Sequence, residues 1–132
     1  MAARSGAKRG RWSALVLWGM VAALLAVAIP AASPTSNQVY LYEHTNYGGA
    51  YMRWDGLRDI PDLRSYNTGA QGSPNWNDRI SSVKVGSDVT LILYQHINYG
   101  GSKLTLKGPA NISSLVASGW NDKASSFRIV PK

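Results

Sequence analysis

Two hexapeptides of the chain carry side chains that suit a hard metal cation. NDRISS occupies residues 77–82, and NDKASS occupies residues 121–126, which is 44 positions later. Each offers an amide oxygen, a carboxylate, hydroxyls and loop carbonyls, and these are the ligands that Ca²⁺ prefers. The alternative is that Asn-Asp only starts a turn and that the serines are ordinary strand-edge residues. One copy alone favours that alternative, whereas two copies at matched places favour a metal site.

A second repeated stretch indicates that the chain consists of two similar halves. YEHTNYGG at residues 42–49 recurs as YQHINYGG at residues 94–101. A sharply folded hairpin needs a residue that accepts a positive φ, which Gly49 and Gly101 do without Cβ strain. The paired tyrosines of each stretch are predicted to pack together over the turn, which adds about 1 kcal/mol beyond area burial. We therefore expect two equivalent hairpin turns.

The pattern around these repeats predicts an all-β domain. Short runs rich in Val, Ile, Tyr and Thr alternate with clusters of Gly, Pro, Asn and Asp, as is typical of antiparallel strands. The predicted strands are QVYLYEH, AYMRW, ISSVKV, VTLILYQH, KLTLK and SSFRIV. Trp76 and Trp120 recur at matched places before the closing strands and are predicted core residues. The first half carries eight extra residues within 57–75, a segment with the composition of a loop.

The turn motif resembles the signature of the βγ-crystallin Greek key, which reads aromatic, four residues, aromatic, one residue, glycine. The residues that fit it are Tyr42, Tyr47 and Gly49, and then Tyr94, Tyr99 and Gly101. The resemblance covers residues 38–131 and implies a β-sandwich of two four-stranded Greek key motifs. The first motif would span about residues 38–86 and the second about residues 89–131.

The same resemblance implies two calcium sites. In microbial members of the family, the pattern Asn/Asp, Asn/Asp, two variable residues, Ser/Thr, Ser binds calcium, and both hexapeptides match it. The family's sites are paired and exchanged between the halves. Side-chain oxygens would come from Asn77, Asp78 and Ser81 and from Asn121, Asp122 and Ser125. Backbone carbonyls would come from Arg79, Lys123 and the opposite turn region, near Glu43 or Gln95.

The basic residues at the third hexapeptide position must point their charges away from the ion. Arg79 and Lys123 can do so if only their carbonyls are ligands. Each hexapeptide has one carboxylate, and so few anionic ligands predict weak binding, with a dissociation constant on the order of 10⁻⁵ to 10⁻³ M. The chain has no cysteine. Bound calcium would then supply stability that disulfides give to other small exported domains.

The first 32 residues differ in composition from the rest of the chain. A basic head precedes 18 uncharged residues from Trp12 to Ile29, and small residues follow. This order is typical of a secretory signal peptide, and an uncleaved membrane anchor is the alternative. Either one would place residues 33–132 outside the cytoplasm as a secreted or extracytoplasmic domain. Contact with a membrane is expected only through the N-terminal segment.

The remaining composition argues against two other ligand classes. Residues 33–132 carry ten basic and seven acidic side chains, a net charge of +3, without a block of basic residues. No nucleic-acid partner is therefore expected. Trp54 is the one tryptophan of this part outside the repeat, and a single ring makes a poor sugar platform.

Enzymatic activity is not expected. His44 and His96 occupy matched places without further Cys or His ligands for zinc, so a shared structural role is predicted for them. Asp59 and Asp62 lie in the inserted segment and have no counterpart in the second half, which indicates a solvated loop. The chain also lacks a Gly-x-Ser-x-Gly nucleophile motif and a phosphate-binding glycine loop.

An alternative function comes from another class of protein with the same fold. Some secreted proteins of this fold resemble protease inhibitors or toxin-like proteins, which bind an extracellular protein target. The insertion from Leu57 to Pro74 would then be the binding loop. Those inhibitors usually carry disulfides, which this chain lacks.

Overall fold

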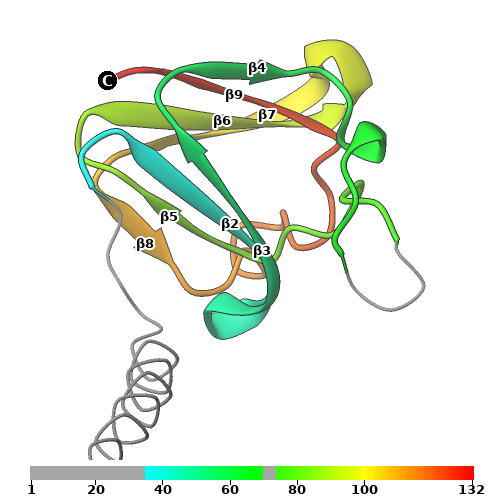
Figure 1. The fold of residues 1–132 in the computed structure, drawn as a ribbon. Coiled ribbons are helices and arrows are strands. Elements are labelled where there is room, and N and C mark those ends of the chain that lie inside the picture. The colour runs from blue at the N-terminus through cyan, green and yellow to red at the C-terminus, as the bar shows by residue number, and fades with distance from the viewer. Residues whose placement is uncertain (1–34, 70–73) are drawn as a thin grey trace, which may run out of the picture. The chain divides into compact units, whose positions relative to one another are not determined.

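The computed structural model describes residues 35–69 and 74–132 (Figure 1). The chain divides into Met1–Ala32 and Ser33–Lys132, and the first part lies outside the described residues. The signal peptide or membrane anchor predicted for residues 1–32 therefore stays a prediction. Within the described ranges, no helix is long and apolar enough to cross a membrane.

Two four-stranded antiparallel sheets pack on each other (Figure 1). The first sheet has the order β3-β2-β5-β8, with β2 (Gln38–His44), β3 (Gly48–Asp55), β5 (Ser82–Val85) and β8 (Ala110–Ile112). The second has the order β4-β9-β6-β7, with β4 (Arg58–Ile60), β9 (Ser126–Pro131), β6 (Val89–His96) and β7 (Gly100–Lys107). The predicted all-β sandwich of two four-stranded Greek key motifs is confirmed.

Each half gives its third strand to the sheet of the other half. β4 comes from the first half and pairs with β9 of the second, with Asp59 opposite Arg128. β8 comes from the second half and pairs with β5 of the first, with Asn111 opposite Lys84. β4 lies within the segment from Leu57 that has the composition of a loop, and it was not among the strands predicted from the sequence. A three-residue strand is too short to show alternation, and its pairing depends on a strand about 70 residues away.

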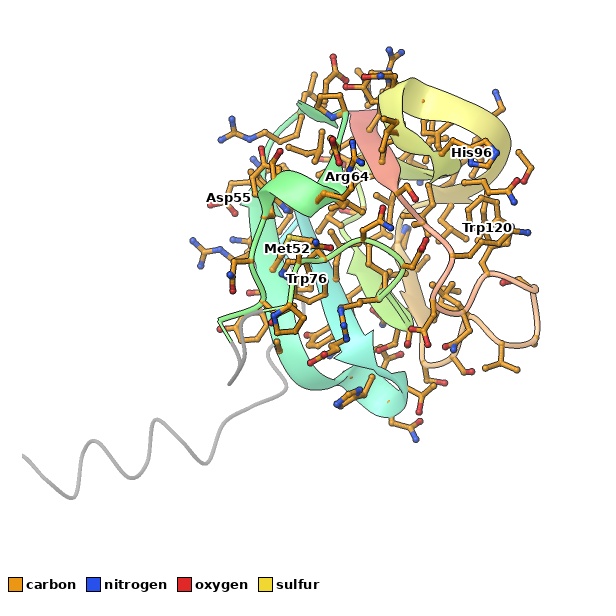
Figure 2. The ribbon with its side chains drawn as sticks, turned by 90° about the vertical axis from the view of Figure 1, so that its right-hand side faces the viewer. Met52, Asp55, Arg64, Trp76, His96 and Trp120 are labelled. Carbon is orange, nitrogen blue, oxygen red and sulfur yellow. The ribbon has the colours of Figure 1, made fainter. Side chains whose placement is uncertain are left out.

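The core lies between the sheets and is built by the two-residue alternation of the strands. Val39 and Leu41 of β2 and Leu91 and Leu93 of β6 are fully or almost fully buried. Each such side chain contributes about 1.5–3 kcal/mol relative to an exposed one. Trp76 and Trp120, labelled in Figure 2, are 1% and 6% exposed, which confirms their prediction as core residues.

The two predicted hairpin turns are present and nearly identical. The rings of Tyr42 and Tyr47 meet edge to face at 5.5 Å, and so do those of Tyr94 and Tyr99. The glycines after them have the predicted positive φ, +75° and +76°. Four further residues of the turns have a left-handed backbone that was not predicted. They are Asn46, Tyr47, Asn98 and Tyr99.

The last serine of each hexapeptide stabilises one of these turns through two hydrogen bonds. Ser82 Oγ donates a hydrogen bond to the His44 carbonyl at 2.6 Å and accepts one from the Tyr47 backbone N–H at 3.0 Å. Ser126 makes the same two bonds to His96 and Tyr99. The hexapeptides are thus tied to the hairpin turns of their own halves.

Candidate metal centre

The turns formed by the two hexapeptides lie side by side. The Asp78 backbone N–H donates to the Ala124 carbonyl at 3.0 Å, and the Asp122 backbone N–H donates to the Ile80 carbonyl at 3.1 Å. Both aspartates have left-handed backbone, with φ of 57° and 53°. Asp and Asn tolerate this conformation better than other residues with a Cβ. The bend that each aspartate makes brings its carboxylate toward the other hexapeptide.

The side chains of the two hexapeptides cross between the halves. Ser81 Oγ donates a hydrogen bond to Asp122 Oδ1 at 2.9 Å. Ser125 Oγ donates one to Asp78 Oδ1 at 3.4 Å. Ser81 and Ser125 are buried, whereas Asp78 and Asp122 are exposed. Each carboxylate therefore sits at the surface above a buried hydroxyl of the other half.

Two open hollows surround these crossed pairs. The first, of about 450 Å³, is lined by Glu43, His44, Thr45, Asp78, Arg79, Ser81, Val116, Asn121 and Asp122. The second, of about 350 Å³, is lined by Asp78, Gln95, His96, Asp122, Lys123 and Ser125. Asn77 lines neither hollow, and each of the other predicted residues lines at least one. The structure thus groups Ser81 with Asp122 and Glu43, and Ser125 with Asp78 and Gln95.

The first residue of each hexapeptide has an unpartnered oxygen. Asn77 Oδ1 and Asn121 Oδ1 are buried and have no hydrogen-bond partner in the described part of the chain. Asn77 Nδ2 donates to Asp78 Oδ2 at 3.0 Å, which fixes the orientation of that amide. An unpartnered buried acceptor costs roughly 1–3 kcal/mol. A cation or water near these oxygens would remove that cost.

The basic third residues have contacts of their own. Arg79 Nη1 lies 3.5 Å from Glu43 Oε2, and Lys123 Nζ lies 5.1 Å above the ring of Trp120. Glu43 Oε1 also accepts a hydrogen bond from the Ala50 backbone N–H at 3.4 Å. The positive charges therefore have partners other than the crossed Asp-Ser pairs.

The histidines of the hairpin turns pack against glycine. A Cβ built on Gly49 would lie 2.5 Å from His44 Cδ2, and one on Gly101 would lie 2.6 Å from His96 Cδ2. Each ring thus occupies the space that the glycine leaves open. No group of three or more His, Cys, Asp or Glu side chains in residues 35–69 and 74–132 is arranged to hold a metal. The oxygen-rich donor set suits a hard cation better than zinc.

Comparison with known proteins decides the family. The sequence model of peptidase inhibitor family I36, a βγ-crystallin-like family, matches residues 32–102, just over half of the chain. A βγ-crystallin from an archaeon is 35% identical, with a TM-score of 0.55, and the match covers 73% of this chain and 100% of that one. The chain belongs to the βγ-crystallin family and to the βγ-crystallin-like family I36.

Two further relatives of this βγ-crystallin come from Physarum polycephalum and Neurospora crassa. Spherulin-3A of Physarum polycephalum is 27% identical over 97 residues, which are 74% of this chain and 85% of that protein. A βγ-crystallin domain of the Abundant Perithecial Protein of Neurospora crassa, solved in its Ca²⁺-bound form, has a TM-score of 0.58. It is 24% identical, with 77% of this chain and 97% of that one covered, so this likeness shows the shared fold.

Sequence reasoning missed two parts of the βγ-crystallin site. Thr45 and Val116 line the first hollow but lie outside both hexapeptides. The Asn46 backbone N–H donates to the Ser113 carbonyl at 2.7 Å, and the Leu115 backbone N–H donates to the Ser81 carbonyl at 2.9 Å. These bonds bring the 113–119 loop to the first hollow. Only the tertiary structure shows this, because the loop carries no repeated motif.

Proposed function

We propose that this βγ-crystallin binds two calcium ions, one in each hollow, and that the ions stabilise the sandwich without catalysis. The single observation that carries the proposal is the reciprocal crossing of Asp122 over Ser81 and of Asp78 over Ser125. It assembles carboxylate and hydroxyl oxygens from both halves at two equivalent places. Oxygen ligands of this kind are those that Ca²⁺ takes in proteins.

The residues that would hold each ion follow from the lining of the hollows. In the first, these are the side chains of Asp122 and Ser81 with the carbonyls of Glu43 and Arg79. In the second, they are the side chains of Asp78 and Ser125 with the carbonyls of Gln95 and Lys123. Asn121 would add its unpartnered amide oxygen to the first set, whereas Asn77 lies beside Asp78 and lines neither hollow. Calcium would supply a divalent charge that joins oxygens of both halves.

The relatives support the proposal at the level of the family. The domain of the Abundant Perithecial Protein has been solved in a Ca²⁺-bound form. That domain shares the fold at 24% identity, so the assignment of ligands depends on the residues of this chain. The non-enzymatic role agrees with relatives that are crystallin-type proteins.

Isothermal titration of the full-length chain with calcium tests the proposal. We expect two binding events, and we expect Asp78→Ala with Asp122→Ala to remove both. Asp88→Ala removes an exposed carboxylate that lines neither hollow, so it should leave the titration unchanged. At a calcium concentration 100-fold above the dissociation constant, one site adds about 2.7 kcal/mol to the free energy of unfolding. A flat titration and an unchanged melting curve for the unaltered protein would refute calcium binding.

We further propose that residues 1–32 direct this domain out of the cytoplasm, where calcium is abundant enough for weak sites. The support is the order of basic, apolar and small residues in the sequence. Cell fractionation and sequencing of the mature N-terminus test the idea. Recovery of the uncleaved chain in the cytoplasm would contradict export.

Peptidase inhibition is a second candidate, because the I36 family model matches residues 32–102. In the segment from Leu57 to Pro74, Leu57 is 57% exposed, whereas Ile60 and Leu63 are buried in the core. A peptidase would therefore meet Leu57 and its exposed neighbours. Inhibition assays against metallopeptidases and serine peptidases, with Leu57→Asp as the variant, test this function separately from calcium. An unaltered rate for every peptidase would exclude it for the enzymes assayed.

A further inference from the structure

The outer face of the first sheet carries a cluster of tyrosines. Strand alternation turns Val39, Leu41 and Val83 into the core, so the residues between them face outward. The ring centroids of Tyr40, Tyr42 and Tyr51 lie 5.9–6.2 Å from one another, with interplanar angles of 16–34°. We call these three residues, together with Tyr47 and Lys84, the tyrosine face. Tyr51, on the edge strand, is 60% exposed.

Lys84 is the cation of this face, and its charge has no acidic partner. The residue is 8% exposed, and its Nζ lies 4.5 Å above the ring of Tyr47. Within the described ranges, no carboxylate forms an ion pair with it. A lysine that is this buried usually has a partner. The ring of Tyr47 attracts the ammonium group but does not neutralise its charge.

In the second sheet, the equivalent cation above a tyrosine ring has an acidic partner. Arg128 lies 4.0 Å above the ring of Tyr99, as Lys84 lies above Tyr47. Arg128 stands opposite Asp59 across the β4–β9 pair, and its Nε is 3.7 Å from Asp59 Oδ1. The residue opposite Lys84 in the matching β8–β5 pair is Asn111, which is exposed and uncharged.

The two other charged residues beside the tyrosine face, Arg53 and Asp55, form an ion pair with each other. Arg53 stands opposite Tyr40 across the β3–β2 pair, and its Nη2 lies 3.3 Å from Asp55 Oδ2. Asp55 projects outward from β3 (Figure 2). The face therefore offers one uncompensated positive charge beside aromatic rings and polar groups that can exchange hydrogen bonds with hydroxyls.

We propose that the tyrosine face binds an acidic polysaccharide. The apolar faces of sugar rings pack on aromatic side chains, and sugar hydroxyls exchange hydrogen bonds with phenol, amide and carboxylate groups. A carboxylate on the sugar would pair with Lys84, and Asn111 could donate a further hydrogen bond to it. A polysaccharide with one carboxylate for every two sugars places its negative charges farther apart than a nucleic acid does, which suits a face with a single free cation. The site is separate from both calcium hollows and does not depend on the proposed calcium binding.

A nucleic acid fits the face less well. Single-stranded nucleic acids carry a negative charge on every nucleotide and are held by grooves with several cations. The tyrosine face has one uncompensated cation, and Asp55 beside it would repel phosphates. The charge pattern therefore favours the polysaccharide.

Affinity electrophoresis of the full-length chain tests the proposal, in gels that contain hyaluronate, a polymer with one carboxylate for every two sugars. EDTA is present throughout, so that calcium cannot bridge the protein and the polymer. We expect retardation by hyaluronate and none by its methyl-esterified form, which has the same sugars without the charge. Asn111→Asp places a carboxylate opposite Lys84, as Asp59 lies opposite Arg128, and should weaken binding about tenfold. Lys84→Met, which keeps the apolar stem, should weaken binding to a similar degree.

The matched control is Lys103→Met on the second sheet. Lys103 pairs with Tyr94 in the second sheet, at the place where Tyr51 pairs with Tyr42 in the first. The variant therefore removes one lysine charge from the equivalent face of the second sheet. It should bind like the unaltered protein, whereas Tyr51→Ala should bind more weakly. Equal loss in Lys103→Met and Lys84→Met would show that only the net charge matters. Equal retardation by the esterified polymer, stronger binding to oligo(dT), or no retardation at all would each overturn the proposal.

Discussion

Ser81 Oγ and Asp122 Oδ1 are 2.9 Å apart although 41 residues separate them in the chain. The equivalent pair, Ser125 and Asp78, is separated by 3.4 Å. Each hydroxyl therefore meets the carboxylate of the other hexapeptide. In the proposed calcium protein, this relationship determines which substitutions affect the same ion.

Ser81→Ala should weaken the calcium-binding event that Asp122→Ala removes, and it should leave the event that depends on Asp78. We expect a loss of about tenfold in affinity, which corresponds to the removal of one oxygen ligand. Titration calorimetry on Ser81→Ala, Asp122→Ala and Asp78→Ala as single variants shows which binding event each substitution affects. Ser87→Ala, an exposed serine outside both hollows, is the control. If Ser81→Ala instead affected the event that depends on Asp78, the crossed arrangement would be wrong.

Leu115→Ala should destabilise the fold far more than Val116→Ala. Leu115 is fully buried, and removing its side chain costs about 2–5 kcal/mol of the free energy of unfolding. Its neighbour Val116 is 60% exposed, so its substitution should change that free energy by no more than about 0.5 kcal/mol. Urea denaturation of both variants, with the midpoint and slope compared, provides the measurement. Equal losses would mean that the 113–119 loop is anchored differently.

Gly49→Ala should cost more stability than Gly56→Ala. Both glycines have a positive φ, +75° and +78°, where an alanine loses about 1–2 kcal/mol. A Cβ at Gly49 also meets the His44 ring at 2.5 Å, whereas nothing lies within 4 Å of one at Gly56. Thermal melts of the two variants separate the backbone strain from the collision. His44→Ala in the Gly49→Ala background should recover part of the difference, and no recovery would place the extra cost elsewhere.

Tyr42 should make the stability of the fold fall in alkaline solution. Burial, followed by the neighbouring tyrosines, raises the pKa of Tyr42 above its ordinary value of 10.0. The folded state therefore prefers the neutral phenol more strongly than the unfolded state does. This contribution is fully present below pH 10.0 and is lost as the pH rises through the raised pKa. Denaturation between neutral and alkaline pH should show a smaller fall in Tyr42→Phe, and an identical fall would assign the effect to other groups.

The repeated parts of the chain could be predicted from sequence because their cause is local. Gly49 and Gly101 must accept a positive φ within a turn of a few residues, and the tyrosines around that turn follow from its shape. Trp76 and Trp120 recur at matched places and are buried. The two hexapeptides could also be found, because they recur at matched places, but the hard cation that they indicate stays a prediction.

The parts that could not be predicted depend on distant segments. β4 and β8 are three residues each, and their strand character comes from pairing with β9 and β5. Nothing in the residues beside Ser81 indicates that its hydroxyl donates to Asp122 rather than to Asp78. The missing partner of Lys84 becomes evident only when Asn111 is seen opposite it.

The exchange of β4 and β8 between the sheets has a consequence for how the protein can be divided. A fragment of residues 38–86 contains β4, which pairs with β9 of the other half. The same fragment lacks β8, which pairs with its own strand β5. Cutting the backbone between β5 and β6 should therefore yield two pieces that fold only by complementation. Two copies of one half could satisfy each other in the same manner, as a symmetric dimer. The single chain thus has the architecture of a two-fold dimer whose two subunits are joined covalently.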